Sequence, residues 1–216
     1  MSSEPTLLSA AHFSYVAERT AGDDDFLRDL KAAAVEAGLP AIWISPAQAS
    51  LMNVLLRLAK AAQVIDVGTL AGYSAISMAR ALPEGGHLVT IELNPKHADF
   101  AEEWIARSDV ADRITVARGP ANEVLPQLAD ESFDAMFLDA DKGGYESYRE
   151  HGLRLLRKGA LFMADNAFAF GELFADQPKD REVVAIREFN DHMARSPGMT
   201  GVIVPAGDGM WVAVKD

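Results

Sequence analysis

Cysteine is absent from this sequence of 216 residues, which excludes disulfide bonds, thiolate metal clusters and a thiol nucleophile. Basic residues are scarce: 20 Lys and Arg stand against 32 Asp and Glu, so the formal net charge is -12. Because nucleic-acid binding requires a basic surface that neutralises phosphates, we expect no nucleic-acid partner. An acidic chain is suited instead to a cation or to a ligand with net positive charge.

Signal-like and membrane-spanning segments are also missing from the sequence. The segment MSSEPTLLSA at the start contains neither the basic region nor the apolar region of a signal peptide. Residues 37–56 carry no charge, but Pro40, Pro46 and Asn53 are residues that a lipid-embedded helix disfavours. We therefore interpret that stretch as a loop followed by a core helix, and we expect a cytoplasmic protein without a membrane partner.

Hydrophobic residues make up 49% of the chain, enough to build the core of one domain over residues 1–216. Residues 1–40 have mixed polarity and predict an N-terminal helical extension. Residues 41–216 are then the core that binds cofactor and metal.

Short β-branched runs alternate with helical stretches from residue 46 onward. Strands are predicted at residues 63–67, 87–92, 114–117, 133–139 and 160–165, and helices at residues 46–60, 72–82, 95–107, 122–128, 145–156 and 180–194. This alternation predicts an α/β fold with a parallel sheet covered by helices on both faces. Two closing β runs, residues 201–205 and 210–214, flank a Gly-Asp-Gly turn and predict an antiparallel hairpin.

The first predicted strand leads into a glycine turn, DVGTLAGYS at residues 66–74. Its two glycines permit a tight turn, and the amides at the following helix start can meet an anionic group. Glu92 ends the second strand, about 20–25 residues after the turn, where an acidic side chain usually holds a ribose diol. Together these features favour a nucleoside ligand. The alternative is an ordinary tight turn followed by an exposed glutamate.

Acidic residues follow the fourth and fifth predicted strands. Asp139 ends one of them, and Asp165 and Asn166 end the other. Because the carboxyl ends of neighbouring parallel strands meet at one edge of a sheet, we expect the three side chains to converge. Their oxygen atoms suit a hard cation such as Mg²⁺, Mn²⁺ or Ca²⁺. The alternative is a set of strand-end side chains that hydrogen-bond local backbone.

The remaining candidate groups are less specific. The five histidines show no ligand spacing, and we interpret them as structural or solvated. Phe168, Phe170 and Phe174 follow the candidate metal residues and form either a substrate wall or part of the core.

Taken together, these segments resemble the metal-dependent class I O-methyltransferases of the catechol and caffeoyl-CoA type. The resemblance covers most of the chain from residue 42 and rests on VIDVGTLAGYS, IELNP, RGPANEVLP, FLDADKGGY, ADN and PAGDGMWVAV. It implies a Rossmann-like class I methyltransferase fold, with a seven-stranded, mostly parallel sheet whose last strand is antiparallel, and a homodimer. Residues 1–40 and 167–181 match poorly, and in the family these segments shape the acceptor pocket.

The resemblance also implies a role for each matched residue. The residues that would contact S-adenosylmethionine are Ile44, Asp66, Gly68, Thr69, Ser74, Glu92, Ala121 and Asp141. Asp139, Asp165 and Asn166 would bind the divalent cation, with Mg²⁺ the first choice. Lys142 matches the base of the catechol branch, and Asp139 would serve catalysis beside it.

The predicted function is methyl transfer from S-adenosylmethionine to a hydroxyl of a catechol-like vicinal diol. Two alternatives remain at this stage. A nucleotide-dependent oxidoreductase would share the sheet and Glu92, but the third glycine of its motif is missing and it has no use for the metal residues. A non-catalytic cofactor-binding module would not need Asp139 and Lys142 together.

Overall fold

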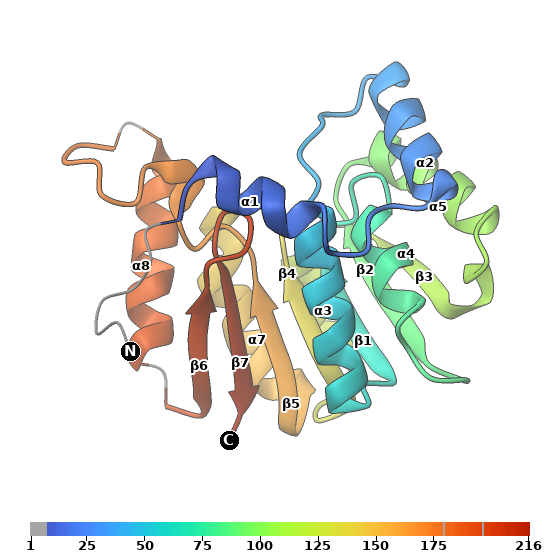
Figure 1. Cartoon of the computed structure of the whole chain (residues 1–216). Helices are drawn as coiled ribbons and strands as arrows, with labels where there is room; N and C mark the ends of the chain where they lie inside the picture. The colour runs from blue at the N-terminus through green and yellow to red at the C-terminus, as the bar shows by residue number, and fades with distance from the viewer. Residues whose placement is uncertain (1–7, 179, 196) are drawn as a thin grey trace.

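The computed structural model describes residues 8–178, 180–195 and 197–216, and these residues form one seven-stranded sheet in the order β3-β2-β1-β4-β5-β7-β6 (Figure 1). The strands are β1 (Gln63–Val67), β2 (His87–Glu92), β3 (Ile114–Arg118), β4 (Phe133–Leu138), β5 (Leu156–Ala164), β6 (Met199–Val204) and β7 (Met210–Lys215). Strands β1 to β5 are parallel, and β7 runs antiparallel to β5 and to β6. The expected α/β class and the antiparallel last strand are confirmed.

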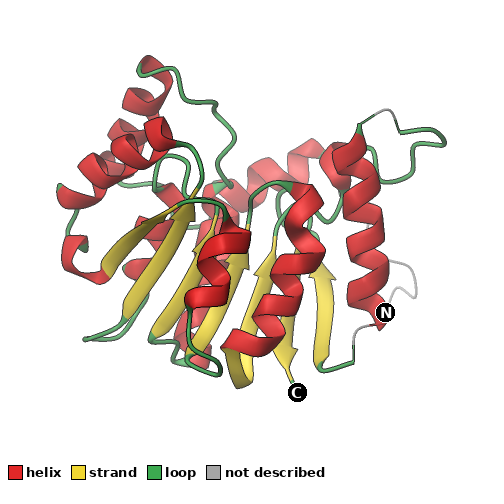
Figure 2. Ribbon diagram, turned by 180° about the vertical axis from the view of Figure 1, so that it is seen from behind, coloured by secondary structure: helices red, strands yellow, loops and turns green. Residues whose placement is uncertain are grey.

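Helices cover both faces of this sheet (Figures 1 and 2). They are α1 (Ala10–Ala17), α2 (Asp25–Glu36), α3 (Pro46–Ala59), α4 (Tyr73–Ala79), α5 (Pro95–Ala106), α6 (Ala121–Val124), α7 (Tyr145–Leu155) and α8 (Arg181–Arg195). Side chains alternate between two cores, because successive residues of a strand point to opposite faces. Val64 of β1 belongs to the core that contains residues of α2 to α5, whereas the next residue, Ile65, belongs to the core that contains residues of α6, α7 and α8.

The N-terminal part of the chain is helical, as expected, over the portion that the structure describes. Asp24 begins α2 because its side chain accepts a hydrogen bond from the backbone N–H of Leu27 at 2.9 Å. Helix α3 begins with a capping box: Ser45 Oγ accepts from Gln48 N at 3.2 Å, and Gln48 Oε1 accepts from Ser45 N at 3.0 Å. Residues 1–7 of the predicted extension lie outside the described residues.

Two predicted elements differ from the structure. The helix expected at residues 122–128 ends after one turn as α6 and continues as a 3-10 turn, η2 (Leu125–Gln127), because Pro126 cannot donate an intrahelical hydrogen bond. The strand expected at residues 160–165 begins earlier, at Leu156. Gly159 lies inside β5 at φ +79°, and the pairing with β4 shifts nearby, so this glycine forms an irregularity within the strand.

Gly68 brings the ends of β1 and β4 together. Its φ is +108°, and a Cβ atom at this position would overlap the carbonyl oxygen of Asp139. The glycine is therefore required by the close approach of two loops at the edge of the sheet. Strand β1 lies between β2 and β4, where the strand order reverses, and a crevice for ligands opens at such a point. No helix among the described residues is long and apolar enough to span a lipid bilayer.

Candidate functional site

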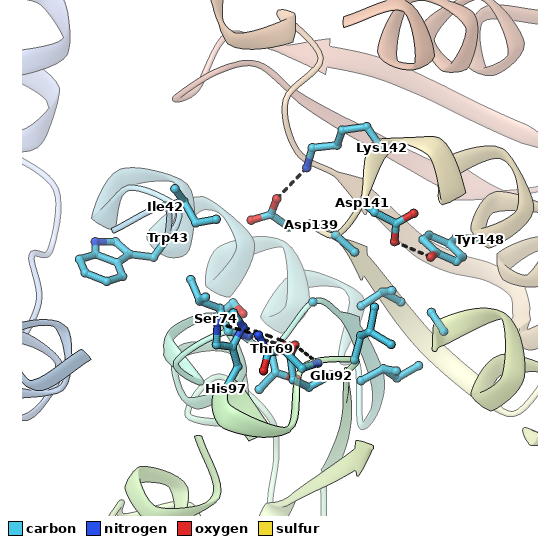
Figure 3. Close-up of a pocket in the computed structure, with 18 of the residues that line it drawn as sticks. Ile42, Trp43, Thr69, Ser74, Glu92, His97, Asp139, Asp141, Lys142 and Tyr148 are labelled. Carbon is cyan, nitrogen blue, oxygen red and sulfur yellow. Dashed lines mark hydrogen bonds and ion pairs between the residues drawn. The ribbon is translucent and has the colours of Figure 1, made fainter. Parts of the chain in front are cut away.

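A cavity of about 720 Å³ lies at this switch point, beyond the carboxyl ends of β1, β2 and β4 (Figure 3). Most of the predicted site residues line it: Ile44, Gly68, Thr69, Ser74, Glu92, Ala121, Asp139, Asp141, Lys142 and Asn166. The two others, Asp66 and Asp165, are buried behind its wall. Segments from six parts of the chain thus meet around one space.

Glu92 is held rigidly at the end of β2. Its Oε2 accepts from the backbone N–H of Leu70 and its Oε1 from that of Asn94, both at 2.8 Å. Each carboxylate oxygen has a further lone pair for a hydroxyl in the cavity. His97 lies on the same wall, with Nδ1 3.6 Å from Glu92 Oε1. Our interpretation of the histidines missed this position because it considered only metal-ligand spacing.

Asp66 does not line the cavity but is buried next to Ser74. Its Oδ2 accepts from Thr90 Oγ1 at 2.9 Å and from Ser74 Oγ at 3.1 Å, and Thr90 also contacts Thr69. Its Oδ1 is buried and has no hydrogen-bond partner among the described residues. Burial raises the pKa of Asp66 to about 7, although the hydrogen bonds from Thr90 and Ser74 act to lower it. A direct contact with the cofactor stays a prediction for this residue.

The variant Asp66→Asn is expected to be more stable than the wild type above neutral pH. The pKa of Asp66 is raised from 3.8 to about 7 in the folded state, so its stabilising contribution is present below about pH 4 and is lost as pH rises through 7. Asparagine keeps the shape without the charge, so the gain at pH 8 is on the order of 4 kcal/mol at most. Urea unfolding of both proteins between pH 4.5 and 8.5 measures it, and parallel pH profiles would contradict it.

Lys142 is buried at the start of the turn η3 (Lys142–Gly144), between two oxygen atoms. Its Nζ donates to Asp139 Oδ1 at 3.0 Å and to the hydroxyl of Tyr145 at 2.8 Å. The Tyr145 hydroxyl donates in turn to the carbonyl of Leu138 at 3.2 Å. Burial raises the pKa of Tyr145 well above its ordinary value, so its proton stays in place. The arrangement holds one ammonium group at the cavity wall beside a carboxylate.

Asp141 is not part of this contact. Its Oδ1 accepts from the hydroxyl of Tyr148 at 2.7 Å, and both residues line the cavity (Figure 3). Of the two acidic neighbours of Lys142, Asp139 therefore forms the ion pair with its side chain, and Asp141 does not. Asp141 and Ala121 both line the cavity.

Asp139 and Asp165 directly follow the neighbouring strands β4 and β5. The N–H of Asp165 donates to the carbonyl of Leu138 at 3.0 Å and extends the β4–β5 pairing. Burial and the negative charge of Asp139 raise the pKa of Asp165 to about 7, while Gln48 Nε2 donates to its Oδ1 at 2.7 Å. A buried carboxylate, Asp165, beside the partly exposed carboxylate of Asp139 is an arrangement that a positive ion would stabilise.

Asn166 completes the oxygen set next to this pair. Its Nδ2 donates to Asp208 Oδ2 at 3.3 Å, which leaves its Oδ1 for other contacts, and the residue lines the cavity. No group of three or more histidine, aspartate or glutamate side chains in the described part of the chain is gathered for a metal. The candidate site instead combines two carboxylates with an amide oxygen, and this donor set fits a hard divalent cation.

The aromatic residues after the candidate metal site have separate roles. Phe170 lies on the cavity wall, Phe174 is 91% exposed, and Phe168 packs against Gly209. Ile42 and Trp43 flank the cavity from the segment before α3 (Figure 3). Of the three phenylalanines, only Phe170 therefore lines the cavity, and a role of Phe170 in a substrate wall stays a prediction.

Comparisons with known proteins decide the family. A family profile described as O-methyltransferase matches residues 17–216. The chain belongs to the O-methyltransferase family. The catechol O-methyltransferase of Niastella koreensis is 37% identical over 93% of this chain and 94% of its own length. The catechol O-methyltransferase of Mycobacterium tuberculosis is 38% identical over 85% of this chain and 83% of its own length.

A solved structure agrees with this assignment. The O-methyltransferase of Bacillus cereus, determined in complex with S-adenosylhomocysteine, has a TM-score of 0.87 at 34% identity, covering 95% of this chain and 97% of that one. The methyltransferase therefore has the expected class I fold and is an enzyme that transfers a methyl group to oxygen. The oxidoreductase and the non-catalytic module are set aside.

Proposed function

We propose that this O-methyltransferase transfers the methyl group of S-adenosylmethionine to one hydroxyl of a catechol-like acceptor, with a divalent cation bound by Asp139, Asp165 and Asn166. One observation carries the proposal: Glu92, which would bind the ribose of the cofactor, lines the same cavity as Asp139 and Asn166, which would bind the cation. Two reactants that occupy these walls have their reacting atoms close together, and positioning of this kind accounts for up to about 7–11 kcal/mol of a barrier in ideal systems.

The donor side is supported by the fixed carboxylate of Glu92. Its two oxygens are oriented by backbone N–H groups, so hydroxyls of a ribose meet acceptors whose position is already set. Ile44, Thr69 and Ser74 also line the cavity and offer apolar and hydroxyl groups for the remainder of the cofactor. S-adenosylhomocysteine in the Bacillus cereus relative supports this ligand class.

The acceptor side is supported by the three oxygen-bearing residues and by Lys142. A bound divalent cation would lower the pKa of an acceptor hydroxyl and stabilise negative charge that develops on its oxygen. Asp139, Asp165 and Asn166 supply the oxygen ligands for it. Names of two curated relatives, both catechol O-methyltransferases, support an acceptor with two adjacent oxygens.

A side chain of the protein, Lys142, is available to the proton that leaves the acceptor hydroxyl. The acceptor oxygen forms a bond to the methyl carbon while the carbon–sulfur bond breaks, and the hydroxyl proton leaves to Lys142 or to water. Lys142 Nζ lies on the cavity wall, held by Asp139 and Tyr145, so its position does not depend on the substrate. As an ammonium it stabilises the developing oxyanion, and as a neutral amine it accepts the proton. The homodimer and the cytoplasmic location stay predictions.

An acceptor series tests the proposal. We expect catechol to be methylated with S-adenosylmethionine and Mg²⁺, and resorcinol and phenol to react roughly 100-fold more slowly or not at all, because they lack the adjacent second oxygen. Mass spectrometry of the methylated products measures the rates. Equal rates for all three acceptors would refute the vicinal-diol requirement, and a protein that binds the cofactor but methylates no member of a wider diol series would refute the acceptor class.

A further inference from the structure

The turn between β6 and β7, residues 205–209, lies against the segment that follows β5. The backbone N–H of Ala167 donates to the carbonyl of Gly209, and that of Phe168 to the carbonyl of Asp208, both at 2.8 Å. These bonds join the turn to residues 165–170, which include two of the candidate metal ligands. The position of this segment therefore depends on a turn about 40 residues later in the chain, which local propensity cannot determine.

The side chain of Asp208 adds two hydrogen bonds to the same segment. Its Oδ2 accepts from the backbone N–H of Phe170 at 2.8 Å and from Asn166 Nδ2 at 3.3 Å. A carboxylate can only accept hydrogen bonds, so the nitrogen of the Asn166 amide faces Asp208. The amide oxygen of Asn166 is consequently turned away from Asp208 and is available for another contact.

The segment adopts a backbone conformation that needs such support. Asn166, Ala169 and Phe170 have φ values of +66°, +52° and +57°, in the left-handed region that residues with a Cβ disfavour. Two of these three residues donate hydrogen bonds to Asp208: Phe170 through its backbone N–H and Asn166 through its side-chain amide. Asp208 thus stabilises both the backbone conformation and the side-chain orientation.

Gln48 holds the neighbouring ligand in a matching way. Its Nε2 donates to Asp165 Oδ1 at 2.7 Å, while its Oε1 accepts from Ser45 N and Ser45 Oγ, each at 3.0 Å. These partners determine which end of the amide faces Asp165. Gln48 is buried and packs on the same turn, because a Cβ atom on Gly207 would overlap its amide group.

We propose that Asp208 and Gln48 are positioning residues: Asp208 directs the amide oxygen of Asn166, and Gln48 the carboxylate of Asp165, for binding the divalent cation. The proposal rests on the metal site of the proposed function. Neither residue lines the cavity, so neither contacts cofactor or acceptor from the wall. Residues that orient metal ligands in this manner usually change metal affinity when they are replaced.

Metal affinity is the direct test. We expect Asp208→Ala to weaken Mn²⁺ binding by about 10–100-fold, measured by electron paramagnetic resonance or calorimetry. Asp208→Asn keeps an acceptor oxygen and should restore part of the affinity, and Gln48→Met, which keeps length without a donor, should weaken binding as Asp208→Ala does. Asp176→Ala removes an exposed carboxylate and is the charge-matched control, for which we expect the wild-type affinity.

The affinity for S-adenosylmethionine, measured on the same samples, shows whether each variant is folded, and we expect it to stay at the wild-type value. Wild-type Mn²⁺ affinity in both Asp208→Ala and Gln48→Met would overturn the inference while leaving the proposed function intact. A wild-type protein that binds no Mn²⁺ and methylates acceptors without it would overturn the metal site itself. Where Asp208→Ala loses cofactor binding through misfolding, Asp208→Asn and Gln48→Met decide.

Discussion

Chelation of divalent cations is expected to reduce catechol methylation to below about one hundredth of its rate, while binding of S-adenosylmethionine remains. The reason is that the residues proposed to bind the cation are separate from those proposed to bind the cofactor. Asp139 and Asn166 line the acceptor side, whereas Glu92 and Ser74 hold the donor side through contacts that involve no residue of the metal set. Turnover and cofactor affinity, measured on protein dialysed against chelator and after Mg²⁺ is restored, check this result.

The variant Asp165→Ala should reproduce the effect of the chelator, and added Mg²⁺ should not restore its activity. Asp165 is buried beside the negative charge of Asp139, so its removal takes away one of the two carboxylates proposed to bind the cation. Asp112→Ala, at an exposed position far along the chain in η1 (Ala111–Arg113), is the matched control. Catechol methylation that survives exhaustive chelation would show that the metal site is wrong.

Replacement of Lys142 by methionine is expected to lower turnover by about 10²–10⁴-fold if the lysine is the general base. The variant keeps the length of the side chain but loses the group that lies 3.0 Å from Asp139 and 2.8 Å from the Tyr145 hydroxyl. The affinity for S-adenosylmethionine should change little, because Lys142 makes no contact with Glu92 or its neighbours. Lys158→Met, which alters an exposed lysine in β5, is the matched control.

Catechols of graded acidity separate the two possible roles of Lys142. A base is needed most where the acceptor hydroxyl has a high pKa, so the loss of activity in Lys142→Met should shrink as the acceptor becomes more acidic. Stabilisation of the oxyanion alone gives a smaller loss. Steady-state rates of both proteins across the series measure the trend, and a loss under about tenfold for every acceptor would remove the base role.

Much of the candidate site follows from local sequence signals. Short β-branched runs bounded by glycine, proline or acidic residues define the strand ends at Glu92, Asp139 and Asp165, because strand propensity and turn chemistry act over a few residues. The order of alternating elements then places those ends at one edge of a parallel sheet. The capping box at Ser45 is a local signal of the same kind, because its two residues are three positions apart.

Pairings between distant segments were decided only by the tertiary structure. Lys142 donates to Asp139, whereas Asp141, which is one residue away from Lys142, accepts from the hydroxyl of Tyr148. The hydrogen bonds that Asp66 accepts from Ser74 and Thr90 were likewise visible only in the folded chain. Such choices depend on which side chains share a buried space, and residue spacing does not reveal that.

The supports of the metal candidates show the same division most clearly. Asp165 and Asn166 are recognisable as strand-end oxygens, whereas their partners, Gln48 and Asp208, lie 117 and 42 residues away along the chain. Each partner also has a local explanation, one in a helix cap and one in a hairpin turn, which conceals its second contact. The sequence by itself determined which oxygen-bearing residues end the strands. Only the folded chain determined how those oxygens are oriented, because buried hydrogen-bonding groups must find partners wherever packing brings them.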